Sequence, residues 1–226
     1  GKAFPEQEVV LRAAHHPARS TRETDLEILY ENRLGPTFQY ELVVPYRAGT
    51  NVPGEGSGLG DVELEAKQVL HFSQQRLEIL SAGLGVSLPT GSETKGLGTG
   101  TVAFAPFLAF GKAWGRTLLQ ASAGGEIPVD REKADPELRY AVGLSRALGP
   151  PTVAFTPALE LVGTYNTRTK AHDYAVWIEG SKPLNKLGHV VGCLGARMPI
   201  RPRDETWSLE FYLLWDFGDG PFWVGW

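Results

Sequence analysis

Residues 207–217 read WSLEFYLLWDF, and their side chains alternate between two chemical kinds. Every odd-numbered position, from Trp207 to Phe217, holds a large apolar residue, whereas the even-numbered positions include Glu210, Tyr212 and Asp216. Successive side chains of a β-strand point to opposite faces of the sheet. The stretch therefore predicts a strand with one apolar face and one polar face.

The same alternation runs through the whole chain of 226 residues. Most of the predicted segments are long enough to cross a bilayer core as tilted strands, which needs about 9–11 residues. We expect an even number of strands, which places both ends of the chain on one side. The twelve predicted strands are 6–14, 23–31, 36–46, 60–72, 76–89, 99–111, 116–128, 137–148, 152–165, 172–182, 188–199 and 205–217.

The connections alternate as regularly as the residues. Tight turns are expected near residues 32–36, 73–75, 112–116, 149–151 and 183–188, and longer polar, glycine-rich loops lie between them. A rim of short turns opposite a rim of long loops is typical of an up-and-down transmembrane barrel. The predicted fold class is therefore all-β and membrane-spanning: an antiparallel up-and-down transmembrane β-barrel of about 12 strands.

Alternation by itself fits equally well a soluble barrel with an apolar core. Lysines argue for lipid on the outside, because of the eight in the chain only Lys67 lies in the middle of a predicted strand. The polar face is instead rich in Gly, Ala, Ser and Thr, which suit a confined interior. Aromatic residues such as Tyr46, Trp114 and Trp207 gather at strand ends, where a membrane places its aromatic girdles.

Three places disturb the pattern. In the fifth predicted strand Ile79 shares a parity with Leu77 but not with Leu80, and a β-bulge near 79–80 would reconcile them. Pro106 and Pro157 fall inside predicted strands, where each removes one ladder hydrogen bond. We expect the prolines to mark bulges or misplaced strand ends.

Three short motifs resemble one known family. They are Gly58-Leu59-Gly60-Asp61, Leu88-Pro89-Thr90-Gly91 and Gly96-Leu97-Gly98-Thr99-Gly100. The chain resembles the bacterial outer-membrane β-barrel family named for the MetA pathway of phenol degradation, most closely over residues 37–110. The resemblance implies an outer-membrane channel or transporter linked to hydrophobic or aromatic compounds. It implies no catalytic residue.

The inward face is predicted to carry charges at membrane depth. Such charges are costly unless they are paired or hydrated. They would line a polar channel whose acidic excess favours cations and neutral solutes; alternatively, they form an ion-pair network that supports a closed barrel. Twelve strands lie between the filled eight-stranded barrels and the open porins. The predicted lumen-lining residues are Glu41, Glu63, Glu65, Lys67, Arg139, Glu160, Glu179, Arg197 and Glu210.

Composition limits the other possibilities. The net charge of −4 is weak and dispersed, which argues against a nucleic-acid partner. The single Cys193 supports neither an internal disulfide nor a metal cluster, and we expect it to pack in the wall. We expect no cofactor, no metal and no catalytic residue. The mean hydropathy of −0.17 is compatible with a barrel, because lipid contacts only every second residue.

Three other groups of residues suggest alternative chemistry. His15 and His16 are predicted in an outer loop, where they would contact metal, lipopolysaccharide or only solvent. Ser81 and Ser87 with His71 form the nearest set for a lipid-modifying enzyme, but no third orienting group is evident. The glycine runs at 54–58 and 96–100 imitate phosphate-binding loops but lack the strand–loop–helix setting, so we interpret them as outer loops.

The sequence thus predicts a single domain over residues 1–226, with 218–226 as a candidate C-terminal tail, located in a bacterial outer membrane after removal of a signal peptide. Outer-membrane lipid, lipopolysaccharide at the basic long-loop rim and a small-molecule solute are the expected partners. A protein partner could bind the tail or the segment before the first strand. The predicted function is passive passage of small solutes, and the runner-up is a non-conducting barrel that anchors or scaffolds a partner.

Overall fold

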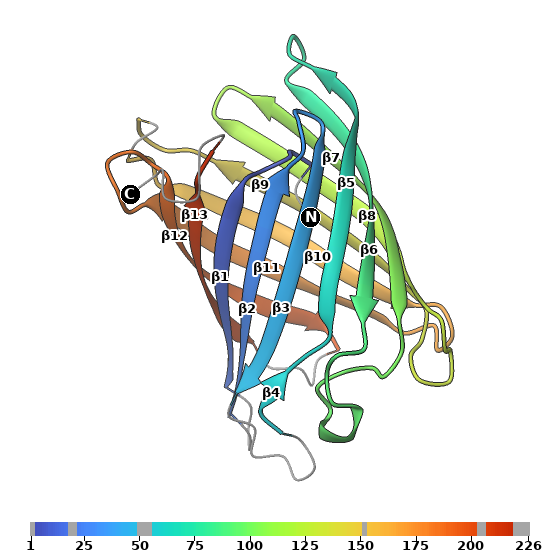
Figure 1. Cartoon of the computed structure of the whole chain (residues 1–226). Coiled ribbons are helices and arrows are strands. Elements are labelled where there is room, and N and C mark those ends of the chain that lie inside the picture. The colour runs from blue at the N-terminus through green and yellow to red at the C-terminus, as the bar shows by residue number, and fades with distance from the viewer. Residues whose placement is uncertain (1–2, 18–21, 49–55, 151–152, 203–206, 219–226) are drawn as a thin grey trace.

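The computed structural model describes residues 3–17, 22–48, 56–150, 153–202 and 207–218. Antiparallel strands form one sheet that closes on itself into a barrel (Figure 1). The strands are β1 Glu8–Pro17, β2 Arg22–Arg33, β3 Phe38–Ala48, β4 Gly58–Leu59, β5 Val62–Ser73, β6 Glu78–Leu88, β7 Ala103–Trp114, β8 Thr117–Pro128, β9 Glu137–Arg146, β10 Thr156–Asn166, β11 His172–Pro183, β12 Val190–Arg201 and β13 Ser208–Asp216.

Twelve long strands make the wall, and the two-residue β4 only extends the edge of β3. Each long strand pairs with its neighbours in the chain, and β1 closes the ring by pairing with β13 from Glu8–Asp216 to His15–Leu209. The short turns lie uppermost in Figure 1 and the long loops lie below. The predicted fold class, an up-and-down barrel of twelve strands, is confirmed.

The outer surface of the wall is apolar. Leu159, Ile178 and Leu194 expose 54%, 49% and 62% of their surface, although they lie in the middle of long strands. Glu210 and Lys67 are buried instead, with 3% and 2% exposed. Water-soluble folds bury apolar side chains and expose charged ones. The reverse distribution in this barrel, with apolar side chains outside and charged side chains inside, is that of a membrane barrel. The described residues contain no helix that is long and apolar enough to cross a membrane.

Aromatic side chains gather at both ends of the wall. At the short-turn end Tyr30 stacks on Phe217 with ring centroids 6.3 Å apart, and Tyr40 lies 6.2 Å away on the other side. At the long-loop end Tyr140 and Tyr174 surround His172, and the Tyr140 hydroxyl lies 2.9 Å from its Nε2. Two such bands match the girdles of a membrane barrel.

The bulge predicted near residues 79–80 is wrong. The pairing of β5 with β6 shifts instead between Val69 and His71, so the extra residue lies in β5. Strand β6 keeps one phase throughout, and Ile79 points into the lumen, where only 3% of it is exposed. The sequence misled because Ile79 is an apolar residue on the inner face.

Both prolines lie within strands. Pro157 stands where β10 pairs with β11, one residue before its pairing with β9 begins at Ala158. Pro106 lies where the β7–β8 register passes from Phe104–Ile127 to Phe107–Gly124 without an intervening pair. Proline has no backbone N–H to donate between strands. Each of the two prolines therefore lies where one neighbouring strand is not paired with it.

The N-terminal end of the barrel differs from expectation. Strand β1 continues to Pro17, which places His15 and His16 in the wall rather than in an outer loop. The segment before β1, expected to contact a partner, lies against the inner face of the barrel. The Phe217 N–H donates to the Gln7 carbonyl 3.1 Å away. Of the candidate C-terminal tail, 218–226, residues 219–226 lie outside the described residues.

Candidate functional site: the lumen

A cavity of about 740 Å³ occupies the long-loop half of the lumen. Its walls come from β2, β3, β5 to β9 and the loop between β6 and β7. Seven carboxylates line it, against two guanidinium groups. The charged lining residues are Asp25, Glu27, Glu41, Asp61, Glu63, Glu65, Glu126, Arg47 and Arg139.

The cavity also has an apolar side. Val43 and Pro45 of β3 and Phe107 of β7 share the lining with the carboxylates. Phe107 fits there because Gly83 on the neighbouring β6 has no side chain, and a Cβ at Gly83 would collide with the Phe107 ring. The cavity can therefore accommodate a solute that has both a polar and an apolar part.

Two cavity carboxylates have no charged partner in direct contact. Within the described part of the chain, the side chains of Glu63 and Glu65 make neither a hydrogen bond nor an ion pair, and the positive charges of Arg139 and Lys67 act on them only from beyond contact distance. Glu126 differs, because it forms an ion pair with Arg139 on the neighbouring strand β9. The surplus of carboxylates over guanidinium groups gives the cavity a negative potential.

Four glutamates form a continuous row on the inner face where the cavity ends. Glu8, Glu31, Glu41 and Glu65 lie directly opposite one another on β1, β2, β3 and β5. Like charges in this relation repel one another. Lys67, two residues beyond Glu65 and 2% exposed, brings a positive charge to the row.

The short-turn half of the lumen is filled by the chain itself. The Ala3 carbonyl accepts a hydrogen bond of 2.6 Å from the Ser81 hydroxyl, and the Phe4 carbonyl accepts one of 3.1 Å from Lys67 Nζ. The Glu6 N–H donates to Gln39 Oε1 2.7 Å away. Ala3 also belongs to an apolar cluster inside the barrel, whose other members are Phe4, Val69, Ile79, Phe107 and Ala109.

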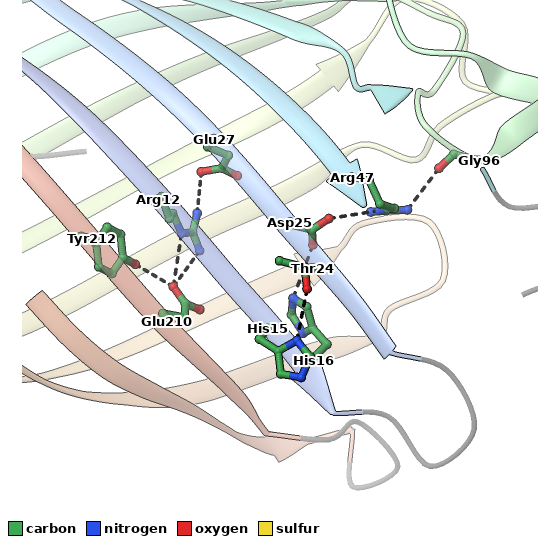
Figure 2. Close-up of polar contacts among 10 residues, drawn as sticks. All are labelled: Arg12, His15, His16, Thr24, Asp25, Glu27, Arg47, Gly96, Glu210 and Tyr212. Carbon is green, nitrogen blue, oxygen red and sulfur yellow. Dashed lines mark hydrogen bonds and ion pairs between the residues drawn. The ribbon is translucent and has the colours of Figure 1, made fainter. Parts of the chain in front are cut away.

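A second polar cluster lies at mid-height on the adjoining strands β13, β1 and β2 (Figure 2). Arg12 donates to Glu27 at 2.8 Å and to Glu210 at 3.0 Å, and the Tyr212 hydroxyl donates to Glu210 at 2.7 Å. The Arg12 guanidinium also lies 5.3 Å from the centre of the Trp177 ring. Charge-assisted bonds combined with a cation–π contact hold this arginine in one position.

Nearer the long loops, a further chain of contacts crosses three strands (Figure 2). His16 of β1 lies 3.4 Å from Asp25 of β2, and Asp25 accepts a bond of 3.1 Å from Arg47 Nε of β3. Arg47 Nη1 then donates to the Gly96 carbonyl in the β6–β7 loop, 3.2 Å away. The predicted strand 36–46 ends before Arg47, whereas the observed β3 includes Arg47, and its side chain lines the mouth of the lumen.

The residues predicted to line the lumen lie on the inner face but in different surroundings. Glu41, Glu63, Glu65 and Arg139 border the large cavity. Glu179, Arg197 and Glu210 lie together on the side of β11 to β13, and Glu160 lies beside Gly143. Lys67 is enclosed. Contact of any of them with a passing solute stays a prediction.

Sequence reasoning missed some of the most connected residues. Arg12 and Trp177 are absent from the predicted lumen-lining residues, as is the lumen position of Ala3 and Phe4. Alternation along residues 8–16 could have assigned Arg12 to the inner face, because the preceding apolar residues Val9 and Leu11 occupy the odd-numbered positions of the outer face. No local pattern indicates that a segment before the first strand folds back inside.

The alternatives for catalysis and metal binding gain no support from geometry. Ser81 faces the lumen and binds the Ala3 carbonyl, whereas His71 lies in the irregular part of β5, 3.8 Å from Glu78. Carboxylate oxygens of Glu6, Glu8 and Glu31 lie within 4.8 Å of one another, but each of these residues has polar partners within the protein. Cys193 lies in the wall of the barrel, and its Sγ is 3.6 Å from Glu179 Oε2.

Charged side chains link the long loops to one another. Lys133 in the β8–β9 loop binds Glu93 at 2.7 Å and the Gly100 carbonyl at 3.2 Å. The hydrogen bond with Glu93 raises the pKa of Lys133. Arg168 binds the Asp135 carboxylate at 2.6 Å and the Arg131 carbonyl at 3.0 Å. Part of the basic rim is thus engaged within the protein.

The fold is similar to those of solved outer-membrane barrels. The "KdgM porin in complex with disordered oligogalacturonate" matches with a TM-score of 0.68 at 10% identity, over 93% of this chain and 99% of that one. An outer membrane channel from Pseudomonas putida F1 matches with a TM-score of 0.69 at 15% identity, over 96% and 97%. The NanC porin matches with a TM-score of 0.65 at 9% identity, over 93% and 99%.

These likenesses show the fold. No protein-family model and no curated protein matches the sequence. The class defined by fold and lumen is therefore a twelve-stranded barrel of the outer-membrane type, and the family named for the MetA pathway remains a resemblance carried by the three motifs.

Proposed function

We propose that this chain is an outer-membrane channel for the passive passage of small solutes and that it is not an enzyme. The observation that carries the proposal is the cavity of about 740 Å³ on the long-loop side, lined by seven carboxylates and two arginines. Polar solutes cross the hydrocarbon core of a membrane poorly, and a polar cavity inside a lipid-embedded wall gives them a path through it. The named functions of the structural neighbours, porins and an outer membrane channel, support the proposal.

The acidic surplus should favour cations. In water, a carboxylate at roughly 8 Å from a passing ion lowers the energy of a cation and raises that of an anion by about 0.5 kcal/mol each, which changes their permeability ratio by a factor of about six. Replacing both Glu63 and Glu65 by Gln should therefore lower the cation-to-anion permeability ratio by up to roughly thirtyfold. Reversal potentials in a potassium chloride gradient across a planar bilayer measure this ratio.

A matched control is Glu78→Gln, because Glu78 is bound to Lys112 at the short-turn end, outside the cavity. This variant should leave the reversal potential unchanged. If Glu63→Gln with Glu65→Gln leaves it unchanged as well, these two residues do not line the conducting path.

The finer proposal concerns hydrophobic or aromatic solutes. Phe107, Val43 and Pro45 lie in the same cavity as the carboxylates, so an organic cation with an aromatic body can contact both. Benzyltrimethylammonium should therefore block the potassium current at lower concentration than tetramethylammonium, which has the same charge and no ring. Equal potency of the two ions would argue against an aromatic preference.

A second candidate is a structural barrel without conductance. The observation that favours it is the filling of the short-turn half by Ala3 and Phe4, which Ser81 and Lys67 hold in place. Flat current traces from protein whose folding is verified by heat-modifiable gel migration would support this candidate and refute the channel.

A further inference from the structure

The loop between β6 and β7, residues 89–102, lies over the mouth of the cavity. Its residues Gly96, Leu97, Gly98 and Thr99 form part of the cavity lining. A short 3₁₀ turn, Glu93–Lys95, stands at the far end of the loop. The position of this loop therefore determines how wide the entrance is.

One carboxylate joins the two arms of this loop. Asp61, the residue before β5, accepts the Gly91 N–H on Oδ1 at 2.9 Å. Its Oδ2 accepts both the N–H and the hydroxyl of Thr99, at 2.7 and 3.0 Å. Gly91 belongs to the outgoing arm and Thr99 to the returning arm. Three bonds to one ionised group hold the arms together more firmly than neutral contacts would.

Glycines make this arrangement possible. A Cβ at Gly98 would collide with the Asp61 carboxylate, and a Cβ at Gly91 would collide with the Leu97 carbonyl. Thr90 adds to the junction, because its hydroxyl donates to the Gly60 carbonyl at 3.0 Å and accepts the Val62 N–H at 2.9 Å. The three motifs of the sequence thus converge on Asp61.

We infer that Asp61 is a positioning residue that holds residues 89–102 as a fixed constriction over the outer mouth of the lumen. Arg47 supports the same loop from β3 through the Gly96 carbonyl, as Figure 2 shows. The effect on conductance rests on the proposed channel function, whereas the position of the loop does not.

The experiment measures the loop and the current separately. A spin label is attached at Thr94→Cys, in the exposed 3₁₀ turn, after native Cys193 has been replaced by Ser. Asp61→Asn presents an amide N–H toward groups that are themselves donors, so the immobilised component of the spectrum should be lost. In planar bilayers the same variant should show higher conductance and more open-state noise.

Three further variants separate position from charge. Gly98→Ala keeps every charge but displaces the carboxylate, so it should reproduce both effects, whereas Gly125→Ala, whose added Cβ makes an ordinary 3.5 Å contact, should change neither. Glu132→Gln removes one negative charge from an exposed loop residue and should also leave the spectrum unchanged.

The outcomes distinguish the two proposals. Unchanged spectra in both Asp61→Asn and Gly98→Ala would overturn the role of Asp61, whatever the conductance. Mobilised spectra from barrels that carry no current would uphold the role of Asp61 in positioning the loop and refute the channel.

Discussion

The two halves of the lumen share one wall but differ in content. The long-loop half holds a cavity of about 740 Å³ with a surplus of carboxylates, whereas the short-turn half holds Ala3, Phe4 and an apolar cluster. The number of strands is the same at both levels, so it does not decide which half is open. Side-chain size and the folded-back segment decide it. Three substitutions test this comparison, from the largest expected effect to the smallest.

The largest effect is expected for Lys67→Met in the filled half. Lys67 binds the Phe4 carbonyl and its charge acts on the half-buried Glu41 and Glu65, so its loss releases the segment and leaves these two carboxylates without a nearby positive charge. We expect a loss of about 3–5 kcal/mol in the free energy of unfolding, faster proteolysis near Phe4 and a higher conductance. Urea unfolding in detergent, limited proteolysis and planar-bilayer recording give these quantities.

Lys112→Met is the matched control, because Lys112 pairs with Glu78 in a half-exposed position at the barrel end. It should cost under about 1 kcal/mol. Equal stability of the two variants would show that the short-turn half is not held by Lys67.

An intermediate effect is expected for Arg12→Met at mid-height. Glu210, which is 3% exposed, would keep only the Tyr212 hydroxyl among the contacts of this cluster, and unfolding should become easier by about 3 kcal/mol. The cation preference should increase, because one positive charge leaves the lumen. Arg139→Met removes the same charge from a residue whose side chain is 55% exposed, so it should shift selectivity with little loss of stability. A stable Arg12→Met variant would mean that the cluster does not brace the wall.

The smallest effect is expected for Glu93→Gln in the outer loops. The pair with Lys133 is exposed on both sides and contributes little. Because the pair raises the pKa of Lys133, its contribution is present below the unfolded lysine value of about 10.4 and disappears as pH rises through the folded value. Urea midpoints of the parent and the variant should therefore stay parallel from about pH 6 to 9. A divergence within that range would assign the pair a larger role.

The sequence predicted the wall better than its contents. Alternation of apolar and polar residues located all twelve long strands, since lipid contact requires an apolar residue at every second position. It failed at Ile79, which is apolar yet faces inward, because the folded-back segment supplies an apolar neighbour there. It also ended the first strand too early, so His15 and His16 were assigned to a loop.

The candidate site shows the same division. The alternation placed Glu41, Glu63 and Glu65 on the inner face. It could not show that the Glu63 and Glu65 side chains make no direct ion pair, whereas Glu210 binds Arg12, which is 198 residues away in the sequence. The glycine motifs were recognised, but their convergence on Asp61 depends on loops that meet only after the barrel has closed.

The sequence by itself determined the period, the strand length and the sign of the interior charge, because all three are local properties of a chain that must present hydrocarbon to lipid at alternate residues. Only the tertiary structure decided where the lumen is open. That depends on which side chains and which segment meet across the barrel, and closure brings together residues whose separation in the chain carries no such signal.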